Sequence, residues 1–234
     1  MIPLIAITTC NRLDNVTKCI ESIKHPVKTL SILVNNSDIS YFDAVREIEI
    51  PDNIGKVEYS YCPQNMGCAS SWNYHMKHYA SEPYWVLLSD DVIIGSDELS
   101  QIEEKIVDHD GVFADKDCNY IFFALKRTML QKVGLFDENF HPGCYEDHDY
   151  RNRMSMRDDV KTTTFVINSL HNGAPAGSGK GGGGTGHGFN DEQKRQWDVC
   201  FRGNQNYYNR KWQSTVDGSW EFDIDERARK ELRI

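Results

Sequence analysis

The sequence lacks three features that would place it in common protein classes. It has no stripe of basic residues, which binding to a nucleic-acid backbone requires. Its 26 lysines and arginines face 35 aspartates and glutamates, for a formal net charge of -9. No apolar run approaches the roughly 20 residues of a membrane-spanning helix, and no C-x-x-C pair suggests a zinc ribbon. We therefore expect no nucleic-acid partner and no transmembrane segment.

The cysteines and the first residues indicate a compartment. Seven scattered cysteines are an odd number and suggest no disulfide framework, and free thiols fit a reducing environment. The start of the chain, MIPLIAITTCNR, lacks the basic residues, the longer apolar run and the cleavage site of a signal peptide. The sequence predicts a soluble, cytoplasmic protein.

Short apolar runs alternate with amphipathic segments, which predicts an α/β sheet with crossover helices. The length of 234 residues suits one domain. The expected strands are Leu4–Thr9, Leu30–Asn35, Val57–Tyr61, Tyr84–Leu88, Tyr120–Leu125 and Thr163–Ile167. The expected helices are Leu13–Lys24, Cys68–Tyr79, Asp97–Val107, a short one ending at Gly134, an acidic one after it and Asp191–Trp212.

One late segment, Asn172–Gly188, contains too many glycines to pack, so we expect a flexible loop. It is either a disordered insertion or a flap over a bound ligand. The insertion is the preferred interpretation, because low-complexity loops usually carry no function of their own.

Two aspartates follow the apolar strand Tyr84–Leu88. Ser89, Asp90 and Asp91 come at its carboxyl end, where ligands bind in open α/β sheets. Neighbouring carboxylates there are costly unless a cation or hydrogen bonds compensate them. Hard oxygen ligands favour Mg²⁺ or Mn²⁺, which in turn bind diphosphate oxygens. A solvated turn explains an isolated acidic pair equally well.

A second acidic group lies at a predicted helix start, in the segment Cys144–Tyr150. The helix dipole favours negative charge there, which explains one or two of these residues. On a helix, Glu146 and Asp149 share a face and Asp147 points elsewhere. One carboxylate can therefore face a substrate and accept the proton of an attacking hydroxyl.

Three other sites are weaker signals. His171 follows a predicted strand, and its imidazole is of interest as a manganese ligand only beside Asp91. The segment Gln64–Asn73 is a turn leading into a helix, whose backbone amides can hold an anion. Ile7–Arg12 and Leu33–Asp38 both end strands in polar residues, which places them at the same sheet edge.

Taken in order, these segments resemble glycosyltransferase family 2, a group with the GT-A fold. ITTCNR is similar to the family's first strand and T-x-N-R turn, LVNNSD to its V-D-N-x-S segment, and NMGCASSWN to N-x-G-x-x-x-x-x-N. LLSDDV is similar to the D-x-D strand end and NYYNRKW to the late Y-x-x-K-W. The most specific match is VGLFDENFHPGCYEDHDY, which fits G-x-F-D-E-x-F followed by E-D-x-D-Y. The resemblance runs from about Ile5 to Trp212.

The resemblance implies a GT-A-type mixed, mainly parallel sheet flanked by helices, and roles for individual residues. Asp91 would be the final metal-binding aspartate, joined by His171, with Mn²⁺ or Mg²⁺ as the cofactor. Asp147 would be the general base, with Glu146 as the alternative. The donor-binding set would be Thr8, Asn11, Arg12, Asn35, Asn65, Gly67, Ser89 and Asp90.

Two residues depart from the family pattern. Ser89 stands where the first aspartate of D-x-D is common, so its contact with the ribose changes. Asn35 replaces the usual base-reading aspartate, and its side-chain carbonyl can still accept a hydrogen bond from uracil or thymine. A UDP or dTDP sugar is therefore the favoured donor.

The predicted function is inverting, metal-dependent transfer of a sugar to an acceptor hydroxyl, on a glycan or another molecule. The predicted domain spans residues 1–212, with a nucleotide-binding half at 1–92 and an acceptor and catalytic-base half at 93–212; a tail follows at 213–234. A nucleotide-sugar pyrophosphorylase would need a glycine-rich basic loop, which TTCNRLDN is not. A non-catalytic binding module would need no base, and a glycoside hydrolase would need no nucleotide.

Overall fold

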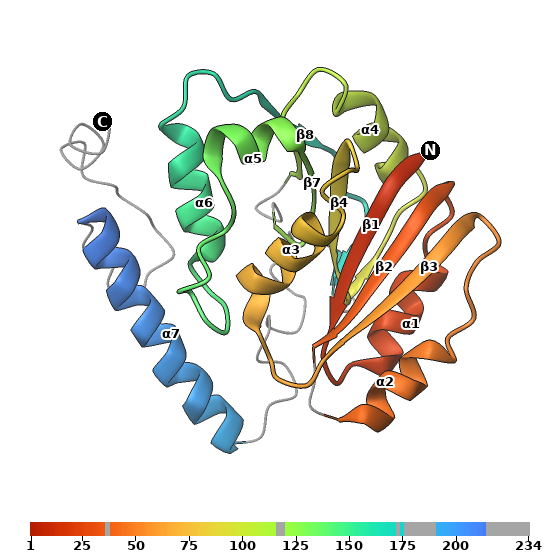
Figure 1. Ribbon diagram of the computed structural model, residues 1–234, viewed down its shortest axis with the longest axis horizontal. Helices are drawn as coiled ribbons and strands as arrows, with labels where there is room; N and C mark the ends of the chain where they lie inside the picture. Colours follow the sequence, from red (N-terminus) through yellow and green to blue (C-terminus); the bar gives the residue numbers. More distant parts are fainter. Residues whose placement is uncertain (36–37, 116–119, 172–173, 176–190, 214–234) are drawn as a thin grey trace.

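The protein is built on a seven-stranded sheet with the strand order β3-β2-β1-β4-β7-β6-β8 (Figure 1). The computed structural model describes residues 1–35, 38–115, 120–171, 174–175 and 191–213. The strands are β1 (Ile2–Thr9), β2 (Val27–Asn35), β3 (Ile54–Cys62), β4 (Tyr84–Ser89), β6 (Gly111–Ala114), β7 (Phe122–Lys126) and β8 (Thr162–Phe165). Only β7 runs antiparallel to its neighbours, so the sheet is mixed and mostly parallel. This confirms the predicted fold class.

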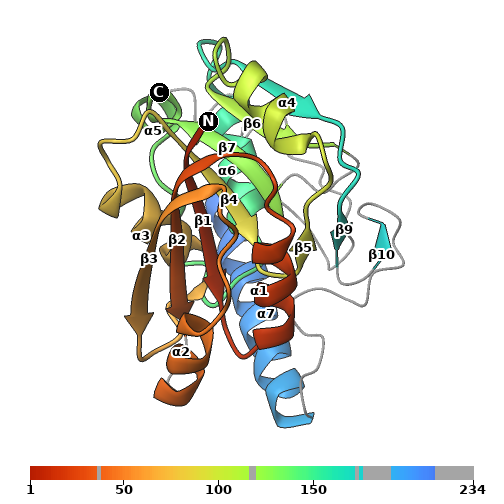
Figure 2. The same ribbon diagram turned by 90° about the vertical axis from the view of Figure 1, so that its right-hand side faces the viewer.

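Helices cover both faces of the sheet (Figures 1 and 2). One face packs against α1 (Leu13–Glu21), α2 (Ile39–Arg46) and α4 (Glu98–Lys105). The other packs against α3 (Gly67–His78), α5 (Arg127–Val133) and α6 (Glu146–Ser155). A last helix, α7 (Asp191–Trp212), lies alongside α6.

The burial of both faces explains why the strands are continuous apolar runs. Along β1, Ile5 and Ile7 belong to the core on the α1 side, whereas Leu4 and Ala6 belong to the core on the α3 side. Side chains of a strand alternate between the faces, so a strand covered on both sides needs apolar residues at consecutive positions. The central strands were therefore recognisable from the sequence.

Most predicted elements are confirmed, and α7 has the predicted bounds. Sequence patterns missed α2, β6 and a small three-stranded sheet of β5 (Val92–Ile93), β9 (Leu170–His171) and β10 (Ala174–Pro175). Strands of two to four residues are too short to show a period. Except for β10, the predicted glycine-rich loop lies outside the described residues, as does nearly all of the predicted tail. Among the described residues, no helix is both long and apolar enough to cross a membrane.

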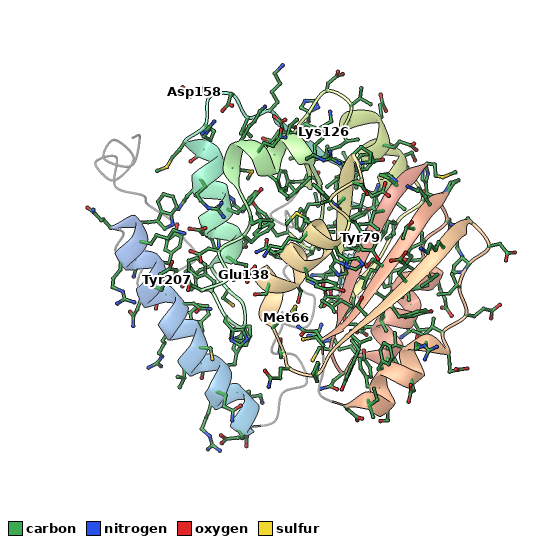
Figure 3. The ribbon with its side chains drawn as sticks, viewed as in Figure 1. Met66, Tyr79, Lys126, Glu138, Asp158 and Tyr207 are labelled. Atoms are coloured by element: carbon green, nitrogen blue, oxygen red, sulfur yellow. The ribbon has the colours of Figure 1, made fainter. Side chains whose placement is uncertain are left out.

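A buried carboxylate joins α7 to α6. Asp149 is fully buried, and its Oδ1 accepts hydrogen bonds from Lys211 Nζ at 2.6 Å and Trp212 Nε1 at 3.0 Å. Its Oδ2 accepts a hydrogen bond from Arg153 Nε at 2.9 Å. Figure 3 labels Tyr207 on α7, whose hydroxyl donates to Asp137 at 2.8 Å. These contacts hold the last turns of α7 against α6 and the turn before it.

We expect Asp149→Ala to lower the free energy of unfolding by about 3 kcal/mol, because it leaves Lys211 and Arg153 without their shared buried partner. This loss of stability is at the low end of the range for a broken buried ion pair, because the side chains of Lys211 and Arg153 are both partly exposed. Trp212→Phe should cost less, about 1.5 kcal/mol, because one hydrogen bond to a charged group is lost. Urea denaturation of both variants measures this order, and equal stability of Asp149→Ala and the wild type would contradict it.

Candidate active site

The parallel strands bring polar residues to one edge of the sheet. Thr8 in β1 pairs with Ser89 in β4, and Asn35 ends the neighbouring strand β2. His171 reaches the same edge because β9 pairs with β5, in which Val92 directly follows the aspartate pair. Residues far apart in the chain thus meet at the carboxyl ends of β1, β2 and β4, as predicted.

Asp91 is the centre of this group. Its Oδ2 accepts a hydrogen bond from Arg12 Nη1 at 2.9 Å, and its Oδ1 accepts one from Ser89 Oγ at 2.6 Å. His171 Nε2 lies 3.3 Å from Oδ1. Burial raises the pKa of Asp91, but the contacts with His171, Ser89 and Arg12 outweigh it and lower the pKa to about 2. Asp91 is therefore an ionised carboxylate at neutral pH.

Asp90 lies beside Asp91 but in a different electrostatic state. Burial, together with repulsion from Asp91, raises its pKa to about 7, and the charge of Arg12 offsets part of this. The guanidinium Nη1 of Arg12 is 3.7 Å from Asp90 Oδ1. The sequence predicted Arg12 for the nucleoside pocket; in the structure its guanidinium contacts both carboxylates. Tyr41, which the sequence did not point to, receives a hydrogen bond from the Arg12 amide at 3.0 Å.

The side chains of Asp91 and His171 are of the types that bind divalent cations. Asp91 and His171 offer one carboxylate oxygen and one imidazole nitrogen within 3.3 Å of each other. Within the described parts of the chain, no group of three or more His, Cys, Asp or Glu residues could hold a metal ion. Cations such as Mg²⁺ usually take one or two protein ligands and complete their coordination with phosphate oxygens and water. Two protein donors suffice for that kind of site.

The turn before α3 corrects one prediction. The amide of Met66 donates to Asn35 Oδ1 at 2.8 Å and that of Gly67 to Asn65 Oδ1 at 2.9 Å. The amide of Cys68 donates to the Pro142 carbonyl at 2.8 Å. Because all three amides have acceptors inside the protein, the predicted anion site at this helix start is not supported.

The same contacts change the interpretation of Asn35 and Gly67. Asn35 is buried, and its Nδ2 donates to Asn65 Oδ1 at 2.9 Å, so both ends of its amide hold the turn in place. Gly67 has a φ of +80°, and a Cβ there would lie 2.8 Å from the Pro142 carbonyl oxygen. Glycine is therefore required where α3 passes close to the turn before α6.

The other predicted donor-binding residues of β1 lie at the same edge. Thr8 Oγ1 is 3.2 Å from His75 Nε2, and Ser31 Oγ is 3.0 Å from His75 Nδ1. Burial lowers the pKa of His75 to about 3, so this histidine is a neutral link between β1, β2 and α3. Asn11 has a positive φ of 58° in the turn between β1 and α1, a conformation that asparagine tolerates.

The acidic helix start has the predicted orientation. Glu146 and Asp149 are buried, whereas the side chain of Asp147 is 30% exposed. Burial, followed by the charge of Asp147, raises the pKa of Glu146, whose Oε2 has no hydrogen-bond partner among the described residues. His148 Nε2 lies 3.8 Å from Asp147 Oδ1, a neighbour that the sequence did not single out as functional. Asp147 is thus the more accessible of the two candidate bases.

The charges of both acidic clusters act on Cys68 in the first turn of α3. Burial raises the pKa of the Cys68 thiol, and the charges of Glu146, Asp147 and Asp90 raise it further. A Cβ added at Gly143 would be 3.1 Å from Cys68 Sγ and 3.7 Å from Glu146 Oε1. Cys68 is thus close to Glu146 and within electrostatic range of Asp90 and Asp147.

Glu146→Gln is expected to gain stability relative to the wild type as the pH rises. A carboxyl with a raised pKa binds its proton more tightly in the folded than in the unfolded protein, so the wild type loses stability above the ordinary glutamate pKa of about 4.3. Glutamine does not titrate and escapes this loss. Urea denaturation of both proteins from acidic to alkaline pH measures the difference, and a constant difference would contradict the burial of an ionisable Glu146.

Comparisons with known proteins identify the family and the fold. Residues 4–164 match the family model named Glycosyl transferase family 2. A mannosyltransferase, PcManGT from Pyrobaculum calidifontis in complex with GDP-Man and Mn²⁺, superposes with a TM-score of 0.58 at 16% identity, over 70% of this chain and 55% of that one. TarS of S. aureus gives 0.52 at 12% identity, over 70% and 58%.

A relative from Leishmania donovani, a galactofuranosyl glycosyltransferase, is 38% identical over 56 residues, which are 24% of this chain and 13% of the relative. The chain thus spans little more than half of these solved structures and a small part of this relative. The fold is that of the GT-A glycosyltransferases. The chain belongs to glycosyl transferase family 2.

Proposed function

We propose that the protein is a metal-dependent, inverting glycosyltransferase that moves a sugar from a nucleoside-diphosphate donor to an acceptor hydroxyl on a glycan. The observation that carries this proposal is the Asp91–His171 pair at the sheet edge, together with the partly exposed Asp147 at the start of α6. A cytoplasmic location is part of the proposal, supported by six free cysteines among the described residues.

Asp91 and His171 would hold Mn²⁺ or Mg²⁺. The bound ion would offset the charge that develops on the departing nucleoside diphosphate. The chain's own contribution is to keep Asp91 ionised and oriented, which the hydrogen bonds from Ser89 and Arg12 do. Arg12 contacts Oδ2, whereas His171 lies at Oδ1, so the two partners use different oxygens of the carboxylate.

Asp147 would accept the proton of the acceptor hydroxyl. The hydroxyl oxygen forms the new bond to the anomeric carbon while the bond to the diphosphate oxygen breaks on the opposite face. A single displacement of this kind inverts the anomeric configuration. Asp147 suits the role better than Glu146, because its carboxylate is open to solvent while Glu146 is buried with a raised pKa.

A UDP or dTDP sugar is the favoured donor, with residues 1–92 binding the nucleotide and 93–212 supplying the base and acceptor contacts. Support for uridine comes from TarS, which has been solved in complex with UDP at a TM-score of 0.51. PcManGT carries GDP-Man, so the fold accepts a different base. The Asn35 side chain donates to Asn65 and accepts from the Met66 amide, both in the turn before α3. The second lone pair of its carbonyl oxygen would accept a hydrogen bond from the nucleotide base.

Calorimetric titration of UDP, dTDP and GDP tests the proposal, with Mn²⁺ and with excess chelator. We expect UDP or dTDP to bind tightly only with Mn²⁺, because the ion links Asp91 to the diphosphate. A bound nucleotide at 100 times its dissociation constant should add about 2.7 kcal/mol of stability, visible as a melting shift. Equal affinity in chelator would remove the metal from the mechanism, and preference for GDP would overturn the base assignment.

A further inference from the structure

A cleft of 370 Å³ opens between α6 and the β6–β8 edge of the sheet, on the face that α3, α5 and α6 cover. Its size is within the range of small-molecule sites, about 300–1,000 Å³. The residues that line it are Phe113, Tyr120, Arg151, Met154, Thr162, Thr163 and Thr164. The mixture of hydroxyls, aromatic rings and one guanidinium is suited to a ligand with both polar and apolar faces.

Strand register tells which threonine hydroxyls face this cleft. Thr164 pairs with Phe113, whose ring packs in the core on the α6 side. Phe165 belongs to the core on the opposite side of the sheet. Because side chains alternate along a strand, Thr162 and Thr164 point toward α6 and Thr163 points away. Two hydroxyls therefore line the floor of the cleft beside the Phe113 ring.

The wall of the cleft continues the helix face that carries the proposed base. Asp147, Arg151 and Met154 are spaced by four and three residues, which puts them on one side of α6. At about 1.5 Å of rise per residue, Arg151 lies about 6 Å and Met154 about 10 Å along the axis from Asp147. Asp149, on the other side, is fully buried.

Tyr120 lines the cleft and lies within electrostatic range of Asp147. Its ring lies 5.4 Å from that of Phe113, and its hydroxyl is buried without a hydrogen-bond partner among the described residues. Burial raises its pKa, and the nearby charge of Asp147 raises it further. The cleft thus connects the side of α6 that carries Asp147 with the edge strand β8.

We propose that this cleft binds the neutral sugar residue of the acceptor and so directs its hydroxyl to Asp147; this inference rests on the proposed function. Sugar hydroxyls both donate and accept hydrogen bonds, as do the threonine hydroxyls, and the guanidinium of Arg151 donates. The apolar face of a sugar ring suits the aromatic floor. Arg151 and Asp147 carry opposite charges on this side of α6, so their combined charge gives no preference for a charged acceptor.

Saturation-transfer-difference NMR with methyl glycosides of glucose, galactose and mannose, and with lactose, tests the proposal without a known acceptor. We expect the wild type to bind at least one of these probes. Thr164→Trp, which fills the cleft from the edge strand, should abolish the signal. Arg151→Met should weaken binding by at least about tenfold, the value of a hydrogen bond to a charged group. If Thr164→Trp fails to fold, Arg151→Met still tests the proposal.

Two substitutions serve as matched controls. Arg157→Met removes an exposed arginine just beyond α6 and outside the cleft. The residue that follows it, Asp158, is labelled in Figure 3. Val107→Trp adds the same ring at an exposed position elsewhere. Both should bind the probes like the wild type, and all variants should bind UDP with Mn²⁺ like the wild type.

The outcomes separate this inference from the proposed function. Failure of the wild type to bind any probe, or an unchanged signal in both Thr164→Trp and Arg151→Met, overturns the sugar site even if UDP binds. Failure of the wild type to bind any nucleotide overturns the proposed function, whatever the glycosides do. Loss of the signal in the cleft variants alone supports the assignment.

Discussion

Asp147→Asn is expected to lower turnover by roughly 10²–10⁴, the usual contribution of a general base, while donor binding survives. Asparagine has nearly the size of aspartate but cannot accept the proton as a carboxylate does. Asp147 is partly exposed at the start of α6 and makes no ion pair with Lys or Arg among the described residues. Its loss should therefore leave the fold intact. Calorimetric UDP binding and steady-state transfer, measured on the same preparation, read the two effects.

Glu146→Gln is the matched control for this experiment. Glu146 precedes Asp147 in the chain but is buried, so Glu146→Gln should keep most of the wild-type turnover. Its stability relative to the wild type should depend on pH, because the pKa of Glu146 is raised. Should Glu146→Gln abolish transfer while Asp147→Asn remains active, the base is Glu146. Near-normal transfer by both variants would mean that the acidic group is structural, and the proposed mechanism would be wrong.

Asp91→Asn is expected to weaken Mn²⁺-dependent donor binding by more than 100-fold and to lower transfer with it. Substitution of groups that only orient a metal ligand typically costs 10–100-fold in affinity, so removal of the charge of the ligand itself should cost more. Asp91 also accepts the hydrogen bonds of Arg12 and Ser89, which the neutral amide would hold less well. Titration with UDP, with and without Mn²⁺, measures the loss.

Ser89→Ala is expected to weaken Mn²⁺-dependent donor binding less than Asp91→Asn does. It removes the hydroxyl that donates to Asp91 Oδ1 at 2.6 Å but keeps the carboxylate, so a loss of about tenfold is expected. If Asp91→Asn binds UDP as well as the wild type does and still responds to Mn²⁺, the metal is held elsewhere. If Ser89→Ala costs as much as Asp91→Asn, the serine is a direct ligand of the donor or the metal.

The sequence by itself determined the elements with strong local patterns. The apolar runs of β1, β2 and β4 were recognisable because strands covered on both faces need apolar residues at consecutive positions. The spacing of the acidic helix separated Glu146 and Asp149 from Asp147, because helical period depends only on residue number. Asp91 could be placed at a strand end because it closely follows the apolar run of β4 in the sequence.

Only the tertiary structure decided which of these residues touch. His171 reaches Asp91 through the two-residue pairing of β9 with β5, which has no period to detect. The guanidinium of Arg12 donates a hydrogen bond to the Asp91 carboxylate. The side-chain amide of Asn35, at the end of β2, forms hydrogen bonds with the turn before α3. Such contacts are set by how buried polar groups satisfy one another across the fold, and no local pattern in the chain records that choice.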